Sequence, residues 1–319
     1  MVTMVQNSFA SAAVIGTGMM GPGVALTLAF GGLPTTLLSR TPEGAAQGLA
    51  KARAQAQLLA ANGLADAAAA QRAAALISVS TDFDATIRAA DLVVESGPED
   101  MAWKQDLFAR MDALAGAVAV LASNTSGLSI TAIAERCARP ERVLTTHFWN
   151  PPHLMPLVEI VQGERTAPAV VDTVCGLLEG CGKTPVVVRK DRPGQLGNRL
   201  QMALLREAVN IIAEGIADAE AIDTVAKNGF GIRMPAYGIL EHQDVVGLDL
   251  GLRVADYVAA DLNNEPRAPE YFHELVRTGQ LGAKTGRGFY DWSVKSADDV
   301  RARRDAFLIE VLRYRRKPD

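Results

Sequence analysis

The sequence predicts an α/β protein in which an N-terminal, doubly wound Rossmann-type domain is followed by an all-α domain. Over residues 1–192, short apolar runs alternate with helical segments, a pattern typical of a parallel sheet covered by helices on both faces. Over residues 193–319, apolar residues recur at helical spacing and no convincing strand is found. Residues 191–194, Asp-Arg-Pro-Gly, interrupt both patterns, so we place the domain boundary between residues 192 and 193.

The composition excludes several functional classes. The 319 residues are 49% hydrophobic and 21% charged, and the net charge of -4 gives no indication of a nucleic-acid partner. The longest apolar run is too short to span a bilayer, and the N-terminal residues lack the pattern of a signal peptide. Cys137, Cys175 and Cys181 lack the spacing of a metal site or a disulfide framework, which favours a reducing compartment. We therefore expect a cytoplasmic protein with no bound metal and no membrane or nucleic-acid partner.

A glycine-rich segment follows the first predicted strand, residues 12–15. Gly16, Gly18 and Gly21 have the spacing of the G-x-G-x-x-G motif. The motif alone is weak evidence because glycines also serve ordinary tight turns, but here it lies between a strand and a helix, as a dinucleotide site requires. We expect Gly16 to allow the turn, Gly18 to admit a pyrophosphate and Gly21 to allow close packing of helix on strand. The helix N-terminus would then face the phosphates.

The second predicted strand, residues 35–38, ends in Ser39, Arg40 and Thr41. Folds that bind NAD usually place an acidic residue here to hold both ribose hydroxyls. Ser39 removes that carboxylate, and Arg40 would hold the 2′-phosphate of NADP, with Ser39 and Thr41 adding hydrogen bonds. We therefore favour NADP as the cofactor. NAD is the alternative, with Arg40 stacked on its adenine.

Residues 44–76 are rich in alanine and are interrupted at Asn62 and Gly63, which predicts a helical hairpin. Further strands, separated by helices, are predicted at residues 77–80, 91–95, 118–122 and 186–188. Ligands of parallel sheets lie beyond the carboxyl ends of the strands. The candidates that fall at this edge are Gly18, Glu95, Ser126 and His147.

The segment Ser123-Asn124-Thr125-Ser126 admits two interpretations. Ser126 precedes a predicted helix, residues 128–134, and would be an ordinary N-cap there. It also follows a predicted strand, where its hydroxyl would meet a substrate. The two roles are compatible and both remain open.

Residues 145–161 contain the pattern that is most informative about chemistry. A short buried strand ends near His147, Pro151 and Pro152 form a rigid turn, and a second strand carries Glu159. If the loop folds back, the imidazole and the carboxylate meet and form a general base whose protonated form is stabilised. The alternative is a core histidine and a surface glutamate.

The C-terminal domain is predicted to be helical throughout. Helices are expected at residues 198–215, 219–227, 237–243, 248–260 and 270–278. Their apolar faces are longer than a small bundle needs, so we expect a dimer. After Trp292 the chain is highly charged with both signs, which predicts a solvated helix.

Taken in order, these segments resemble the L-3-hydroxyacyl-CoA dehydrogenase family over residues 12–292. No single piece is decisive, but the ordered set is specific. Its pieces are residues 16–23, residues 123–126, residues 147–151 (His-Phe-Trp-Asn-Pro), Glu159, residues 193–199 (Pro-Gly-Gln-Leu-Gly-Asn-Arg) and residues 284–290 (Lys-Thr-Gly-Arg-Gly-Phe-Tyr).

The resemblance implies NAD(P)-dependent hydride transfer at the 3-position of a 3-hydroxyacyl-CoA, as in fatty acid metabolism, by a homodimer formed through the C-terminal domain. His147 would be the catalytic acid/base and Glu159 its orienting partner, while Ser126 and Asn198 would hold the reacting oxygen. The residues expected at the cofactor are Gly16, Gly18, Met19, Met20, Gly21, Ser39, Arg40, Thr41, Glu95, Lys104 and Asn124.

Two features depart from the family pattern. Ser39 replaces the acidic residue of typical NAD-using members. In CoA-using members the hairpin forms an arm over the CoA, often with several lysines, whereas residues 44–76 carry only Lys51, Arg53 and Arg72. Relatives with the His-Phe-Trp-Asn-Pro-Pro-His form include dehydrogenases of small free compounds such as carnitine, gulonate and pyridine carboxylates. A free 3-hydroxy acid, a ketone or a cyclic imine is therefore the alternative substrate.

An alternative from another class is a non-catalytic structural protein, because lens crystallins are related to this family. Loss of His147 or Glu159 would be expected in such a protein, and both residues are present.

Overall fold

The computed structural model of the chain describes residues 9–315. It divides into two compact units, one holding the chain up to Asn198 and from Arg303 onward, the other holding Arg199–Ala302. Residues 1–8, which include most of the segment judged for a signal peptide, and residues 316–319 of the charged tail lie outside the described residues.

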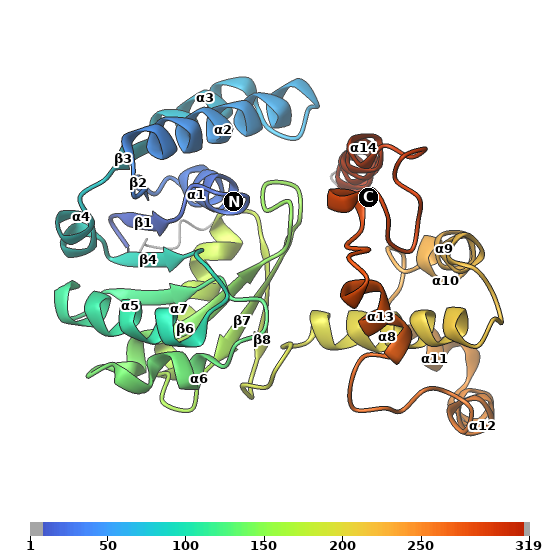
Figure 1. Cartoon of the computed structure of the whole chain (residues 1–319). Helices are drawn as coiled ribbons and strands as arrows, with labels where there is room; N and C mark the ends of the chain where they lie inside the picture. The colour runs from blue at the N-terminus through green and yellow to red at the C-terminus, as the bar shows by residue number, and fades with distance from the viewer. Residues whose placement is uncertain (1–8, 316–319) are drawn as a thin grey trace. The chain divides into compact units, whose positions relative to one another are not determined.

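An eight-stranded sheet forms the centre of the first unit (Figure 1). The strand order is β3-β2-β1-β4-β5-β6-β7-β8, and neighbouring strands are parallel except for the antiparallel pair β6 and β7. The order reverses between β1 and β4, and ligands of doubly wound sheets bind at such a point. The strands are β1 (Ala12–Ile15), β2 (Thr35–Leu38), β3 (Ile77–Ser80), β4 (Leu92–Glu95), β5 (Val120–Ser123), β6 (Val143–Phe148), β7 (Leu157–Gln162) and β8 (Thr184–Val188).

Helices cover both faces of this sheet, which confirms the predicted doubly wound class. The helices that follow the strands in this unit are α1 (Gly21–Phe30), α2 (Pro42–Ala61), α3 (Ala67–Ala75), α4 (Phe83–Ala89), α5 (Met101–Leu114), α6 (Ile130–Ile133) and α7 (Pro168–Gly180). Most begin at a side-chain N-cap, for example Asp66 of α3 and Asp100 of α5. Helix α1 has no side-chain cap, so the N–H groups of its first turn are not satisfied by a side chain of its own.

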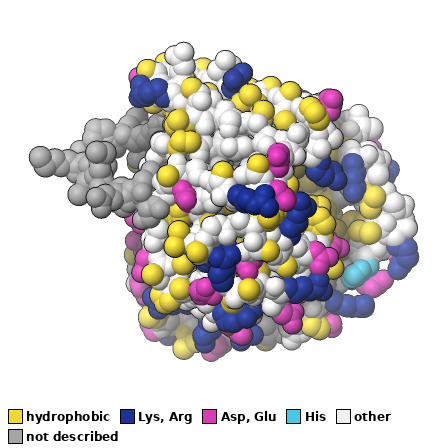
Figure 2. All heavy atoms as spheres, turned by 90° about the vertical axis from the view of Figure 1, so that its left-hand side faces the viewer, with side chains coloured by type: hydrophobic (Ala, Val, Ile, Leu, Met, Phe, Trp, Pro, Cys, Tyr) yellow, Lys and Arg dark blue, Asp and Glu magenta, His cyan; other side chains and the backbone are white. Residues whose placement is uncertain are grey.

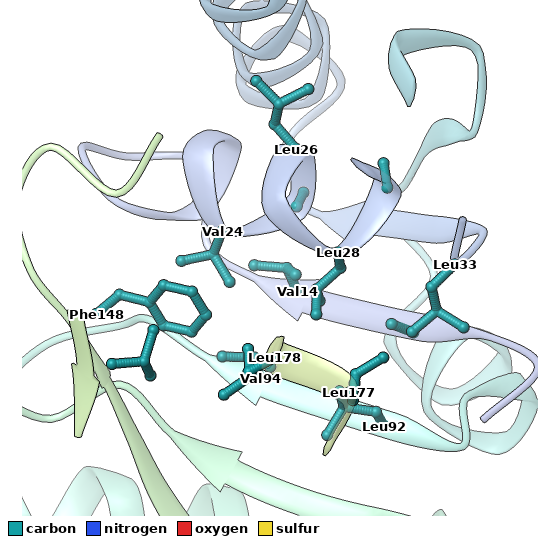
Figure 3. Packing of buried hydrophobic residues seen from close by; sticks show 14 of the residues in the cluster. Val14, Val24, Leu26, Leu28, Leu33, Leu92, Val94, Phe148, Leu177 and Leu178 are labelled. Atoms are coloured by element: carbon teal, nitrogen blue, oxygen red, sulfur yellow. The ribbon is translucent and has the colours of Figure 1, made fainter. Parts of the chain in front are cut away.

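Alternating residues of the central strands build two separate apolar cores. Val14 and Val94 point to the face covered by α1 and α7, where they join Leu28 and Leu178 (Figure 3). Ala13 and Val93, the preceding residues on the same strands, belong instead to a second core with Phe108 of α5 and Ile133 of α6. Because both faces of β1 and β4 are buried, these strands are continuously apolar, as expected of parallel strands.

The second unit is helical, as predicted. It contains most of α8 (Gly197–Ala213), then α9 (Ala219–Asn228), α10 (Phe230–Arg233), α11 (Ile239–Val246), α12 (Leu248–Ala259) and α13 (Glu270–Arg277). Among the described residues of this unit, β pairing is limited to two isolated bridges at Arg287. Val209 and Leu275 are buried, whereas Leu248, Leu252 and Tyr257 of α12 are exposed.

The C-terminal helix α14 (Ala297–Arg315) departs from the prediction. We expected one domain from residue 193 to residue 319 and a solvated tail. Instead, the first unit extends to Asn198 and also includes the chain from Arg303 onward. Ile309 is only 8% exposed, and Leu308 and Leu312 pack against the same core as α1. These three residues form an apolar stripe at helical spacing. The high charge of the tail hides this stripe in the sequence.

The described surface has a mixed character. On the face drawn in Figure 2, basic side chains are interspersed with acidic ones rather than gathered over one element. Within residues 9–315, every helix is too short or too polar to cross a lipid bilayer.

Candidate active site

His147 and Glu159 meet across the antiparallel pair β6 and β7. The two residues are register partners in the ladder, so their side chains point to the same face of the sheet. His147 Nδ1 lies 2.8 Å from Glu159 Oε2, and the two residues are 5% and 1% exposed. With Nδ1 bonded to the carboxylate, Nε2 is the ring nitrogen left for a substrate.

Glu159 is held as a carboxylate by four donors. Oε2 accepts from His147 and, at 3.1 Å, from Trp149 Nε1; Oε1 accepts from the backbone N–H groups of Leu196 and Gly197, both at 2.9 Å. Burial by itself raises the pKa of Glu159, but these hydrogen bonds outweigh it and lower the pKa to about 2. Glu159 therefore remains negatively charged beside the imidazole at any physiological pH.

The loop between His147 and Glu159 is anchored by Lys183, the residue before β8. Its Nζ donates to the carbonyl oxygens of Pro152 at 2.6 Å and Met155 at 2.9 Å. Burial lowers the pKa of Lys183 to about 8. Pro152 also packs on α1, because a Cβ placed on Gly23 would come within 2.6 Å of its ring. The loop after His147 is thus tied to the helix that follows the glycine-rich segment.

The glycine-rich segment has the geometry that a dinucleotide requires. Gly16 has a φ of 107°, and a Cβ on it would lie 2.6 Å from the carbonyl oxygen of Ser96. A Cβ on Gly21 would lie 1.8 Å from the oxygen of Gly16, so the helix can begin here only with glycine. Around Gly18 nothing lies within 4 Å of a Cβ position. This open space lies beside the uncapped N-terminus of α1, so the segment fits a pyrophosphate.

Ser39, Arg40 and Thr41 follow β2, immediately beside this segment. Ser39 Oγ accepts from the N–H of Thr41 at 3.3 Å, and Thr41 Oγ1 accepts from the N–H of Gly44 at 3.1 Å as the cap of α2. A Cβ on Gly44 would lie 3.4 Å from the hydroxyl of Thr17, which places the turn next to the glycine-rich loop. The side chain of Arg40 is exposed.

Glu95 and Lys104, which we expect at the cofactor, form a buried ion pair beside the strand ends. Lys104 Nζ lies 2.7 Å from both oxygens of Glu95, and the residues are 1% and 0% exposed. Ser123 Oγ and the N–H of Gly97 also donate to Glu95, at 2.7 and 2.5 Å. All the acceptor positions of Glu95 are therefore used inside the protein. The pair holds the ends of β4 and β5 and the start of α5 together beneath the site.

Glu99 faces the site instead, and sequence reasoning missed it. Its carboxylate accepts from Thr125 Oγ1 at 2.7 Å and from the N–H of Ser126 at 2.5 Å, and Lys104 Nζ lies 3.9 Å away. The available signal was its position after the end of β4, five residues before Lys104. In the sequence, Glu95 and Glu99 are both candidates for the carboxylate that faces the site. Only the direction of their side chains distinguishes them.

The structure also places Asn124, Ser126 and Asn198. Asn124 Oδ1 accepts from the N–H of Phe148 at 2.8 Å, and Asn198 Nδ2 donates to the carbonyl of Ser126 at 2.6 Å. Ser126 is not the N-cap of the next helix. Ser129 caps α6, with its Oγ accepting from the N–H of Ala132 at 3.1 Å, because the helix begins at Ile130 rather than at residue 128.

A cavity of about 460 Å³ brings most of these residues together. It is lined by Met19 and Met20 of the glycine-rich loop, by Glu99, Asn124 and Ser126 beyond the strand ends, and by His147, Trp149 and Asn198. The cavity thus joins the His147–Glu159 pair to the loop that precedes α1. That arrangement suits proton transfer at a substrate held beside a nucleotide cofactor.

Comparisons with known proteins show the family of the chain. The family model for the NAD binding domain of 3-hydroxyacyl-CoA dehydrogenase matches residues 11–192, and the model for the C-terminal domain of the same enzyme matches residues 194–292. The chain is 35% identical over 304 residues to 5-formyl-3-hydroxy-2-methylpyridine 4-carboxylate 5-dehydrogenase of Mesorhizobium japonicum, covering 94% of this chain and 96% of the relative. It is 36% identical over 285 residues to a probable 3-hydroxybutyryl-CoA dehydrogenase of Bacillus subtilis, covering 89% and 98%.

A solved structure is also similar over nearly the whole chain. It is described as 5-formyl-3-hydroxy-2-methylpyridine 4-carboxylic acid 5-dehydrogenase, an NAD+ dependent dismutase. The TM-score is 0.88 at 34% identity, covering 96% of this chain and 98% of that one. Two family models that together span both units, and relatives matched over most of their length, show that the chain belongs to the 3-hydroxyacyl-CoA dehydrogenase family and is an oxidoreductase with the NAD binding domain of that family.

Proposed function

We propose that the protein transfers hydride between a nicotinamide cofactor and a hydroxyl- or carbonyl-bearing carbon of a small substrate that is not a CoA thioester. The observation that carries the hydride-transfer proposal is the His147–Glu159 pair, which leaves His147 Nε2 as the nitrogen for substrate in a cavity that also contains Met19 and Met20. A bound nicotinamide supplies the acceptor of hydride in oxidation and its donor in reduction.

The residues of the chain act on the proton and on the substrate oxygen. In oxidation, His147 Nε2 removes the hydroxyl proton as the carbon loses hydride; in reduction, the imidazolium returns a proton to the carbonyl oxygen as the carbon gains hydride. Glu159 stabilises the imidazolium in both directions because it stays charged. Ser126 and Asn198 supply neutral hydrogen bonds to the oxygen on which charge develops.

The proposal of a small substrate is supported by the α2–α3 hairpin. Its basic residues are few, Lys51, Arg53 and Arg72, so little positive charge is available for the phosphates of CoA. The turn of this hairpin is bound to the C-terminal helix, because Arg313 Nε of α14 donates to the carbonyl oxygen of Asn62 at 2.8 Å. The pyridine-carboxylate relative covers 94% of the chain, against 89% for the butyryl-CoA relative, and the family models end at residue 292.

For the cofactor we propose NADP rather than NAD. Ser39 stands where NAD-binding folds usually carry an acid, and Arg40 is exposed beside the glycine-rich loop. A guanidinium at this position suits the 2′-phosphate, which a carboxylate would repel.

The quaternary structure and location are proposals as well. We propose a homodimer formed through the second unit, because α12 exposes Leu248, Leu252 and Tyr257. A cytoplasmic location is supported by the three free cysteines, Cys137, Cys175 and Cys181.

Consumption of NADPH and of NADH tests substrate and cofactor together. The substrates compared are acetoacetyl-CoA, free acetoacetate and a pyridine carboxylate that bears an aldehyde. We expect turnover with a free substrate, faster with NADPH, and none with the thioester. Turnover restricted to acetoacetyl-CoA would overturn the substrate proposal. It would show that this protein acts on acyl-CoA, as the name of the Bacillus subtilis relative indicates for that enzyme.

The same assay carries its own control. His147→Gln should lower turnover by about 100-fold to 10,000-fold on the substrate that reacts, because the acid/base group is lost. Cofactor binding, followed by fluorescence of the reduced nicotinamide, should be unchanged. Full turnover in this variant would refute the role of His147.

A further inference from the structure

Trp149 shares the carboxylate oxygen that orients the catalytic histidine. Glu159 Oε2 accepts from His147 Nδ1 at 2.8 Å and from Trp149 Nε1 at 3.1 Å. The two rings lie beside each other, with centroids 5.4 Å apart and planes inclined at 50°. Two donors that are two residues apart, His147 within β6 and Trp149 just after it, therefore meet at one oxygen atom.

The position of the indole is fixed by the backbone on its other side. A Cβ on Gly197 would come within 2.2 Å of Trp149 Cζ2, so the ring lies directly against this glycine. The N–H of the same glycine donates to Glu159 Oε1 at 2.9 Å. The Trp149 hydrogen bond is thus part of a packed arrangement.

The shared oxygen has an electrostatic consequence. A carboxylate accepts about four hydrogen bonds, and Glu159 has all four. Each neutral donor withdraws negative charge from the carboxylate, so less of that charge stabilises the protonated imidazole. The backbone donors bond the other oxygen, whereas Trp149 competes with His147 on the same one.

We infer that the indole N–H of Trp149 lowers the proton affinity of His147 and so shifts its acid/base range towards lower pH. Trp149 is a positioning residue in this sense, because it acts through Glu159. The other titratable group that lines the cavity is Glu99, which is bonded to Thr125 and Ser126. The nearby charges of Glu95 and Lys104 are paired with each other.

The direct test is the titration of His147 by NMR in the wild type and in Trp149→Phe. The chain has four histidines, so His153, His242 and His273 serve as internal references, and His147→Gln assigns the signal. The titration midpoint of His147 should rise by roughly half a unit to one unit in the variant. An unchanged or lower midpoint overturns the proposal. This reading is independent of turnover, so it does not depend on which substrate the enzyme uses.

Wider solvent access in the variant would also raise the midpoint, and a double-mutant cycle separates the two causes. In a Glu159→Gln background there is no carboxylate to share, so Trp149→Phe should leave the midpoint nearly unchanged. An equal rise in both backgrounds assigns the effect to solvent and refutes the shared-oxygen proposal. Trp149→Leu lacks the same N–H and should match Trp149→Phe, which keeps the test open if one variant does not fold.

Activity gives a second reading that rests on the proposed function. Oxidation needs the neutral imidazole, so the acidic limb of kcat/KM should move to higher pH in Trp149→Phe. Reduction needs the imidazolium and should persist to higher pH. If the midpoint rises and the rate profile does not follow, His147 is not the acid/base and the proposed mechanism fails, while the inference about Trp149 stands.

Discussion

The charge of Glu159 couples the stability of the fold to pH. Its pKa is lowered from 4.5 to about 2 in the folded state by donors that outweigh the cost of burial. The unfolded chain therefore takes up a proton at a higher pH than the folded protein does. The stabilisation is complete above pH 4.5 and is lost as the pH falls towards 2.

Denaturant unfolding of the wild type and of Glu159→Gln at pH 6 and pH 3 measures this contribution. Between these pH values the wild type should lose about 2 kcal/mol more than the variant, which lacks the titrating group. Equal losses in the two proteins would show that the donors around Glu159 do not favour its charged form.

The residue at position 39 determines whether a carboxylate lies at the site proposed for the 2′-phosphate, and Ser39 is uncharged. Ser39→Asp should lower the preference for NADPH over NADH by roughly tenfold or more, because a carboxylate repels the phosphate. Ser39→Asn, similar in size and uncharged, is the matched control and should change the preference less. The measured quantity is the ratio of kcat/KM for the two cofactors. A wild type that favours NADH would contradict the NADP proposal.

At the scale of elements, α14 completes the core beside α1. Ile309 is 8% exposed and belongs to that core, whereas Phe307 on the same helix is 61% exposed. Ile309→Ala should lower the free energy of unfolding by about 2 kcal/mol because it leaves a cavity. Phe307→Ala should change it by less than about 0.5 kcal/mol. Urea denaturation compares the two, and equal effects would mean that α14 does not pack as described.

At the scale of the whole molecule, the proposed homodimer predicts that the exposed apolar residues of α12 contact a second copy of the chain. A dimer has a mass of 2 × 33.8 = 67.6 kDa, which light scattering after gel filtration distinguishes from a monomer. Replacing Leu252 and Tyr257, which are 62% and 85% exposed, by glutamate should yield the monomer. Val118→Glu, at an 87% exposed position of the first unit, is the control. A wild-type monomer would refute the dimer.

Much of the architecture follows from local patterns in the chain. Strands and helices differ in the period at which apolar residues recur, so the alternation up to β8 and the change to helical spacing are legible without a structure. The pairing of His147 with Glu159 was also predictable, because two strands joined by a proline turn bring their facing residues together. Gly16 and Gly21 were also predictable, because the G-x-G-x-x-G spacing between a strand and a helix is a local pattern in the sequence.

Other features depend on contacts between distant segments and were decided only by the tertiary structure. Glu95 ends β4 and Glu99 follows four residues later, and the bonds that turn Glu95 inward come partly from Ser123, 28 residues away. The contact of Arg313 with Asn62 joins residues 251 apart, and the charge of the tail conceals the three apolar residues that make α14 pack. The N–H of Trp149 shares an oxygen of Glu159 with His147, a contact that no sequence pattern indicates. Periodicity reports which face of an element is buried, whereas the direction of a single polar side chain is set by partners that the fold supplies.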